Sequence, residues 1–313
     1  MDPVMLPAAS VPGILHFVPP NLSAFEPTKP LIENTSTNTV LWVGGLCDTL
    51  LSVSYPLAIA KALGPSWSLI TASLSSSGLQ FGIGSISQDV KDINKILAYI
   101  HSRRPSGKIV LMGHSTGCQD CLQYAIDTSQ GHGIKIAGLI LQAPVSDREA
   151  LHMILPEAHM VEANRTALDL CEKSHGNDIL AVRLTEPIFG KAPISAKRWV
   201  DLASPGPDHT GADDMFSSDL SDERLLKTFG MIPAEAPLLM LYSGKDEAVP
   251  EHVNKKKLIQ RWVDVRKQRG GTVDTVNGGI VPDATHNLNG CPEHVVTDII
   301  SRVLGFISSI ESR

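Results

Sequence analysis

Residues 108–120 read Lys108-Ile-Val-Leu-Met-Gly-His-Ser-Thr-Gly-Cys-Gln-Asp120, and this stretch decides the expected fold. An apolar run leads into the motif Gly-x-Ser-x-Gly, and a helix-like segment follows it. The pattern predicts a very tight turn between a strand and a helix, because Gly113 and Gly117 lack a Cβ and let the two elements approach closely. In such a turn Ser115 takes a strained backbone conformation that exposes its hydroxyl. The N–H group of Thr116 has no intrahelical partner, so it points where an oxyanion would form.

The length and composition of the chain indicate a globular protein of one large domain with an insertion, or of two domains. The chain has 313 residues, of which 42% are hydrophobic and 19% charged. No apolar run is long enough to span a bilayer, and residues 1–7 lack the basic and apolar regions of a signal peptide. A net charge of −6 argues against nucleic-acid binding. We therefore expect a cytoplasmic protein with neither a membrane nor a nucleic acid as partner.

The cysteines do not indicate a metal site. There are five of them, and Cys118 and Cys121 form a C-x-x-C pair without a second pair at metal-binding spacing. We expect five reduced thiols, no bound metal and no cofactor.

Strands rich in Val, Ile and Leu alternate with helical patterns along much of the chain, which predicts an α/β protein with a mostly parallel sheet covered on both faces. Two short runs, 13–18 and 22–25, predict an antiparallel hairpin at the sheet edge. The remaining strands are expected at 38–43, 67–73, 109–112, 135–144, 238–243 and 271–276. The last helix is expected at 293–310.

The alternation stops after Val145 and resumes at Ala236, with helical and loop-like sequence between them. We expect residues 1–145 and 231–313 to form the core and residues 146–230 to form a cap over the strand ends. The segment from Asp147 to Gly230 holds 15 acidic and 9 basic residues, which accounts for the whole net charge. These acids either attract cationic ligands to the site beneath the cap or face solvent. They include Asp213, Asp214, Asp219, Asp222 and Glu223.

A serine hydroxyl needs a base to act as a nucleophile, and the base needs an orienting acid. Where such a turn carries the serine, the acid and then the histidine follow along the chain. Asp246 comes directly after the strand at 238–243 and is the expected acid, with Glu247 as the competitor. His286 lies in the expected loop before the last helix and is the expected base. His294 falls at the start of that helix, and His114 is expected to support packing.

A second oxyanion donor is expected after the strand at 38–43, where a pair of glycines lets a backbone N–H turn toward the nucleophile. Leu46 is the expected donor beside Thr116, and Gly45 is the alternative. The Ser/Gly-rich stretch at 75–84 faces the same end of the sheet. It either lines a substrate pocket, with Ser75, Ser76 and Ser77 as contacts beside Gly45, or is a flexible connection.

The chain resembles α/β-hydrolases from beginning to end. More narrowly, Gly113-His-Ser-Thr-Gly-Cys-Gln-Asp120, the serine-rich loop at 75–78 and Ala284-Thr-His-Asn-Leu288 resemble a fungal family of siderophore esterases acting on fusarinine C. The resemblance implies a cytosolic serine esterase that cleaves the esters of an iron-carrying hydroxamate ring and helps to release iron. It places the nucleophile on Ser115, the acid on Asp246 and the base on His286.

Two other functions remain compatible with these residues. One is the cleavage of a peptide, thioester or lactone by the same three side chains. The other is a catalytically inactive fold that only binds a ligand, because a fold does not determine a function.

Overall fold

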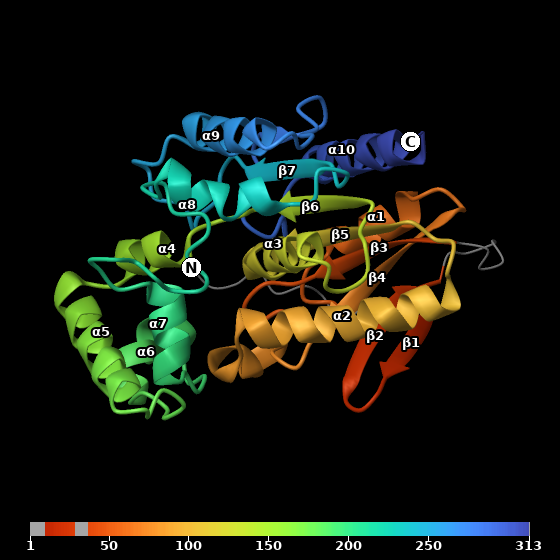
Figure 1. The fold of residues 1–313 in the computed structure, drawn as a ribbon. Helices are drawn as coiled ribbons and strands as arrows, with labels where there is room; N and C mark the ends of the chain where they lie inside the picture. The colour runs from red at the N-terminus through yellow and green to blue at the C-terminus, as the bar shows by residue number, and fades with distance from the viewer. Residues whose placement is uncertain (1–9, 29–36, 313) are drawn as a thin grey trace.

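An eight-stranded sheet runs through the computed structural model, which describes residues 10–28 and 37–312 (Figure 1). The N-terminal stretch on which the signal-peptide argument rests lies outside these residues. The strand order is β1-β2-β4-β3-β5-β6-β7-β8. The strands are β1 (Gly13–Val18), β2 (Leu22–Pro27), β3 (Asn38–Val43), β4 (Trp67–Ser73), β5 (Ile109–His114), β6 (Gly138–Gln142), β7 (Leu238–Ser243) and β8 (Gly279–Val281).

Most of the sheet is parallel. The strands β1 and β2 form an antiparallel hairpin at one edge, and β2 pairs antiparallel with β4. All pairings from β4 across to β8 are parallel. The expected α/β architecture and the edge hairpin are therefore confirmed.

Helices bury both faces of the sheet, which explains why its central strands are continuous apolar runs. Because side chains alternate along a strand, Leu41 and Val43 of β3 pack into one core cluster, whereas Val40 and Trp42 pack into the other. The first cluster lies under α2 (Ile86–Arg103), α3 (Thr116–Ser129) and α9 (Lys255–Gln268). The second lies under α1 (Tyr55–Ala62) and α10 (Glu293–Glu311).

The last strand does not lie where the sequence pattern placed it. Residues 271–276 contribute only an isolated bridge between Val273 and Leu238, and the strand that extends the sheet is β8. The reason is Asp274, whose carboxylate accepts the N–H groups of the second and third residues after it and closes a turn. The apolar pattern of 271–276 was therefore a wrong prediction of a strand.

The segment between β6 and β7 contains helices and no named strand within the described residues. Its elements are α4 (Asp147–Ile154), α5 (Glu157–Glu172), α6 (Val182–Phe189), α7 (Ala196–Ala203), α8 (Asp222–Leu226) and the 3-10 helix η2 (Phe229–Met231). Figure 1 shows α5, α6 and α7 gathered to one side of the sheet. These three helices contribute to a third core cluster, which includes Met160, Leu184 and Trp199.

The serine- and glycine-rich stretch after β4 is more ordered than a plain loop. It contains a 3-10 helix, η1 (Gly78–Ile83), whose Phe81 joins the third core cluster. Ser195 donates its N–H to the carbonyl oxygen of Gly82 at 2.8 Å, and a Cβ on Gly82 would lie 2.1 Å from the carbonyl oxygen of Pro193. The stretch is thus packed directly against the segment that precedes α7. Of the described helices, none is long and apolar enough to cross a membrane.

Candidate active site

The turn between β5 and α3 holds Ser115 in a conformation that side chains rarely adopt, with φ 52° and ψ −126°. Its tightness comes from the flanking glycines. A Cβ on Gly113 would lie 2.3 Å from the carbonyl oxygen of Gly117, and one on Gly117 would lie 2.4 Å from that of Val43. The N–H of Ser115 is donated to the carbonyl oxygen of Gln142 on β6 at 3.1 Å, which fixes the turn against the neighbouring strand.

Three of the expected residues meet at the carboxyl ends of neighbouring strands. Nε2 of His286 lies 2.8 Å from Oγ of Ser115, and Nδ1 of His286 lies 2.9 Å and 3.0 Å from the two carboxylate oxygens of Asp246. Asp246 follows β7 and His286 follows β8, so loops at the same edge of the sheet bring them together. The carboxylate of Asp246 is fully buried, whereas the imidazole keeps 19% of its surface exposed.

Two opposing effects act on the pKa of His286. Burial lowers the pKa, because it disfavours the charged imidazolium, but the Asp246 carboxylate raises it through charge and hydrogen bonding. The net result is a pKa above the ordinary 6.5. The arrangement therefore makes the imidazole a stronger base than an isolated histidine.

Glu247, the competing acid, binds a different part of the same loop. Its carboxylate accepts the backbone N–H of His286 at 2.9 Å and raises the pKa of the imidazole through its charge. Glu247 is exposed to solvent. His294 is also exposed, in the first turn of α10. Of the two candidate carboxylates, only Asp246 is hydrogen-bonded to the ring.

The backbone around the nucleophile offers two free donors. Within the described part of the chain, the N–H groups of Thr116 and Leu46 have no acceptor. The N–H of Gly45 is instead donated to Oδ2 of Asp48 at 2.8 Å. Asp48 also accepts the hydroxyl of Ser52 at 2.8 Å, so it ties the loop after β3 into one shape. The sequence signal for this loop-fixing role of Asp48 was an acidic residue three positions after a glycine pair, and it was not recognised from the sequence.

His114 lies beneath the site and is neutral. Its ring is buried, which lowers its pKa to about 4, and it stacks on Trp42 at a centroid distance of 6.2 Å. Its Nδ1 and Oε1 of Gln142 are 2.6 Å apart. The structure thus agrees with a packing role for His114.

Gln142 links the two halves of the site, and sequence reasoning did not identify it. Besides holding His114, its Nε2 donates to the carbonyl oxygen of His286 at 3.2 Å and to Oγ of Ser243 at 3.3 Å. The signal available in the sequence was a polar residue that ends an otherwise apolar strand.

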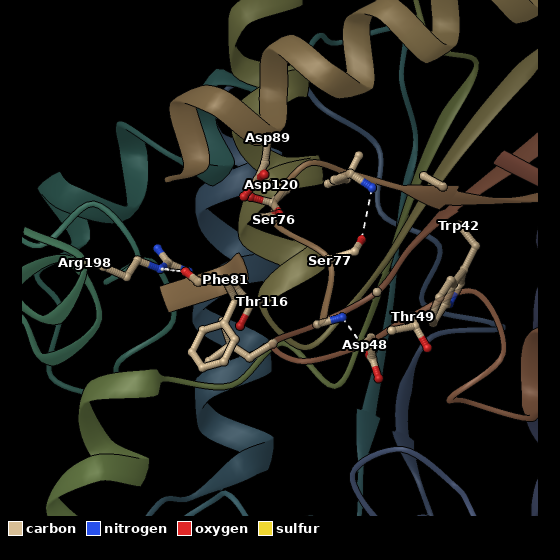
Figure 2. A pocket seen from close by; sticks show the side chains of 15 residues that line it. Trp42, Asp48, Thr49, Ser76, Ser77, Phe81, Asp89, Thr116, Asp120 and Arg198 are labelled. Atoms are coloured by element: carbon tan, nitrogen blue, oxygen red, sulfur yellow. Dashed lines mark hydrogen bonds between the residues drawn. The ribbon is translucent and has the colours of Figure 1, made fainter. Parts of the chain in front are cut away.

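The serines after β4 divide into two groups. Ser75 donates both its N–H and its hydroxyl to Oδ2 of Asp92, at 3.0 Å and 2.5 Å, and is not part of the lining of the cavity that Ser76 and Ser77 share. Ser76 and Ser77 line a small cavity together with Gly45, as Figure 2 shows for the two serines. The expected contacts are thus brought together except for Ser75.

Residues 10–28 and 37–312 contain no group of three or more His, Cys, Asp or Glu side chains that could hold a metal ion. All five cysteines are free thiols. Sγ of Cys118 lies 3.3 Å and 3.1 Å from the carbonyl oxygens of Gly113 and Gln142, the two acceptors within reach of its S–H group, so the thiol supports the nucleophile turn.

Comparison with known proteins agrees with this fold. The protein named fusarinine C esterase sidJ from Aspergillus fumigatus is 35% identical over 347 residues, covering 97% of this chain and 98% of the relative. The solved structure named siderophore hydrolase EstB, also from Aspergillus fumigatus, matches with a TM-score of 0.85 and 35% identity over 97% of this chain and 99% of that chain. A solved α/β-hydrolase fold protein of unknown function matches with a TM-score of 0.65 at 16% identity, covering 98% of each chain.

The resemblance expected from the sequence motifs is therefore confirmed at the level of family and fold. Residues 5–308 also match the family described as protein of unknown function DUF1749. The chain belongs to DUF1749 and to the same α/β-hydrolase family as these fungal relatives.

Proposed function

We propose that this protein is a serine esterase in which Ser115 is the nucleophile, His286 the base and Asp246 the orienting acid. The observation that supports the proposal most strongly is the chain of contacts from Oγ of Ser115 to Nε2 of His286 at 2.8 Å, and from Nδ1 to Asp246 at 2.9 Å. The free N–H groups of Thr116 and Leu46 are the proposed oxyanion donors.

The reaction proceeds through an acyl-enzyme. His286 takes the proton of Ser115 as Oγ attacks the ester carbonyl, and the developing negative charge on the carbonyl oxygen is bound by the two N–H groups. His286 then gives its proton to the departing alcohol. A water molecule, deprotonated by His286, attacks the acyl-enzyme and frees the acid and the serine. Asp246 keeps the proton of neutral His286 on Nδ1 and stabilises the imidazolium. No cofactor takes part.

The proposed substrate is a hydroxamate siderophore such as fusarinine C, and the proposed role is iron release in the cytoplasm. The names of the two relatives at 35% identity, a fusarinine C esterase and a siderophore hydrolase, support this substrate class. The iron of a ferric siderophore is cargo and does not act in the reaction.

The segment 146–230 is the proposed cap. Its core cluster is in contact with Leu46, one of the proposed oxyanion donors, and includes Phe81 of η1. The segment therefore packs against the loops that border Ser115, which is the position from which a cap contacts a substrate.

Labelling and hydrolysis assays test the proposal together. We expect a fluorophosphonate to label the protein at Ser115, and the protein to hydrolyse ferric or iron-free fusarinine C. Ser115→Ala should abolish both results. Ser129→Ala is the matched control, because the Ser129 hydroxyl binds only the Ile126 carbonyl oxygen of its own helix.

The outcomes separate the alternatives. Hydrolysis of simple esters but not of siderophores would keep the esterase and reject the substrate. A folded protein that neither takes the label nor cleaves any ester would favour a binding protein.

A further inference from the structure

The proposed oxyanion donor Leu46 lies inside a turn that is closed by two hydrogen bonds. The N–H of Asp48 is donated to the carbonyl oxygen of Gly45 at 3.1 Å, and the N–H of Gly45 is donated in return to Oδ2 of Asp48 at 2.8 Å (Figure 2). Leu46 and Cys47 are therefore the two central residues of a β-turn. The N–H groups at both ends of the turn are used, whereas that of Leu46 has no acceptor among residues 10–28 and 37–312.

The third residue of this turn is strained. Cys47 has a φ of 65°, and glycine or asparagine normally occupies a turn position with positive φ. Other side chains persist in such a conformation only where surrounding contacts impose it. Cys47 is exposed, so the packing of its own side chain does not supply those contacts. The turn is thus held in shape from its ends.

Asp48 makes most of the contacts at these ends. Besides binding Gly45, its carboxylate accepts the hydroxyl of Ser52 at 2.8 Å, and its carbonyl oxygen accepts the N–H of Gly78, the first residue of η1, at 3.0 Å. Only 17% of the Asp48 side chain is exposed. One residue therefore joins the turn to the segment before α1 and to η1.

His114 lies beside the carboxylate of Asp48 but does not orient it. Because Nε2 of Gln142 donates to the carbonyl oxygen of His286, Oε1 of Gln142 faces Nδ1 of His114, and Nδ1 carries the hydrogen of the neutral ring. Nε2 of His114 then has no hydrogen, and it lies 3.8 Å from Oδ2 of Asp48, which is another acceptor. The carboxylate is consequently oriented by the donors of its own loop.

We propose that Asp48 is a positioning residue for the oxyanion pocket, because its carboxylate holds the strained turn that directs the N–H of Leu46 toward the carbonyl oxygen of the ester. This inference rests on the serine esterase activity proposed above and adds a residue that acts through Leu46. A donor that is already oriented needs no rearrangement when negative charge develops in the transition state. Loss of the carboxylate should therefore lower kcat far more than it raises KM.

The charge of Asp48 has a second effect, which can be measured separately. Burial lowers the pKa of His286, but the carboxylate of Asp246, followed by the charges of Glu247 and Asp48, raises it. A substitution that removes the charge of Asp48 should therefore lower the pKa of His286. The other ionisable side chains that act on this imidazole are His114, with 5.1 Å between the ring centroids, and Asp147.

Asparagine at position 48 removes the charge but keeps the geometry. Its Oδ1 can accept the N–H of Gly45, and its amide can donate to Oγ of Ser52, whose hydroxyl can turn to the carbonyl oxygen of Thr49 at 3.2 Å. With p-nitrophenyl butanoate as substrate, Asp48→Asn should keep kcat within about threefold of wild type, because the turn keeps its hydrogen bonds. The rise of kcat/KM with pH should move to lower pH, because the pKa of His286 falls.

Alanine and glutamate at the same position disturb the geometry. Asp48→Ala should lower kcat at least tenfold and by up to about 10³, the loss that follows removal of one oxyanion donor, while KM changes by less than about threefold. Asp48→Glu keeps the charge but displaces the acceptor by one methylene group, so kcat should fall about tenfold without a shift of the pH profile. Glutamate also keeps the test decisive if the alanine variant does not fold.

Glycine at position 47 offers a rescue. Because glycine takes positive φ without a steric cost, the turn then needs less support from Asp48. The double variant Cys47→Gly and Asp48→Ala should recover kcat by about threefold or more over Asp48→Ala alone. A general weakening of the fold by the alanine would not be corrected in this way.

Binding of hexyl trifluoromethyl ketone supplies a readout that does not depend on turnover. Oγ of Ser115 bonds to the ketone carbon, the serine proton passes to His286, and the resulting alkoxide is bound where the ester oxyanion would be. The dissociation constant should rise in Asp48→Ala by about the factor by which kcat falls. It should stay near the wild-type value in Asp48→Asn.

Asp274→Ala is the matched control. The carboxylate of Asp274 also closes a turn, by accepting the N–H groups of Val276 and Asn277, but this turn lies beside Leu238, at the end of β7 away from Asp246. This variant can lower the stability of the fold, yet it should leave kcat, the pH profile and ketone binding unchanged.

The outcomes distinguish the two proposals. If Asp48→Ala keeps wild-type kcat and ketone binding while hydrolysis still depends on Ser115, the positioning role is refuted and the esterase stands. Equal losses of kcat in Asp48→Asn and Asp48→Ala would also refute it, because the charge rather than the geometry would then matter. If the wild-type protein cleaves no ester and Ser115 takes no label, both proposals fail.

Discussion

Replacing Ser115 by glycine and by alanine separates the strain of the turn from the chemistry of the hydroxyl. The observed φ of 52° and ψ of −126° suit glycine, and a side chain held in such a region costs about 1–3 kcal/mol. Glycine recovers this strain but loses about 0.5–1 kcal/mol through the greater freedom of the unfolded chain. The Ser115→Gly protein should therefore be about 1 kcal/mol more stable than Ser115→Ala. Both should lose turnover by a factor on the order of 10⁴ or more.

Urea unfolding and ester hydrolysis measure the two effects separately. Ser301 supplies the control, because it is exposed in the middle of α10 and its hydroxyl binds only the Thr297 carbonyl oxygen of the same helix. There the order should reverse, with glycine about 1 kcal/mol less stable than alanine. If glycine is also the less stable residue at position 115, the turn is not strained as argued. An alanine variant that keeps a tenth of wild-type turnover would show that Ser115 is not the nucleophile.

Other predictions concern the acid, the base and the turn. Asp246→Asn should lower kcat by a factor on the order of 10⁴, because it favours the wrong tautomer of His286, whereas Glu247→Gln should cost far less; the reverse ranking would move the acid to Glu247. The value of kcat/KM should rise with pH and level off above the pKa of His286, which lies above 6.5, since only neutral imidazole can accept a proton. In the residual activity of Asp246→Asn, the rise of kcat/KM with pH should move to lower pH. If it stays at the same pH, a group other than His286 is responsible for the rise. Gly117→Ala should destabilise the fold by about 1–3 kcal/mol, because its Cβ would lie 2.4 Å from the carbonyl oxygen of Val43; thermal melting measures this loss, and an unchanged melting temperature would contradict it.

The nucleophile turn and most of the strands could be predicted because their signals are local. A Gly-x-Ser-x-Gly turn needs its glycines for backbone clearance, and buried parallel strands need continuous apolar runs. The sequence favoured Leu46 over Gly45 as the second donor, but the contact that distinguishes the two N–H groups could not be read from it. It depends on the side chain of Asp48, which takes the N–H of Gly45 and leaves that of Leu46 free.

The failures share a physical cause, which is tertiary pairing that a linear pattern does not contain. Residues 271–276 have the composition of a strand, but the side chain of Asp274 closes a turn there. The strand that pairs with β7 is instead β8. Asp213 was expected either to attract cationic ligands or to face solvent, but it is buried and paired with Arg198. The catalytic roles of the three facing side chains remain predictions until the assays above are done.

Gln142 connects the nucleophile turn and the loop of His286 through hydrogen bonds. Its carbonyl oxygen accepts the N–H of Ser115 in the nucleophile turn, and its side-chain amide donates to the carbonyl oxygen of His286. A residue in the middle of the sheet therefore fixes the position of both segments. In many enzymes a catalytic loop loosens on warming before the body of the protein melts. Here the histidine loop is hydrogen-bonded to a central strand, so thermal inactivation should coincide with melting of the sheet rather than precede it.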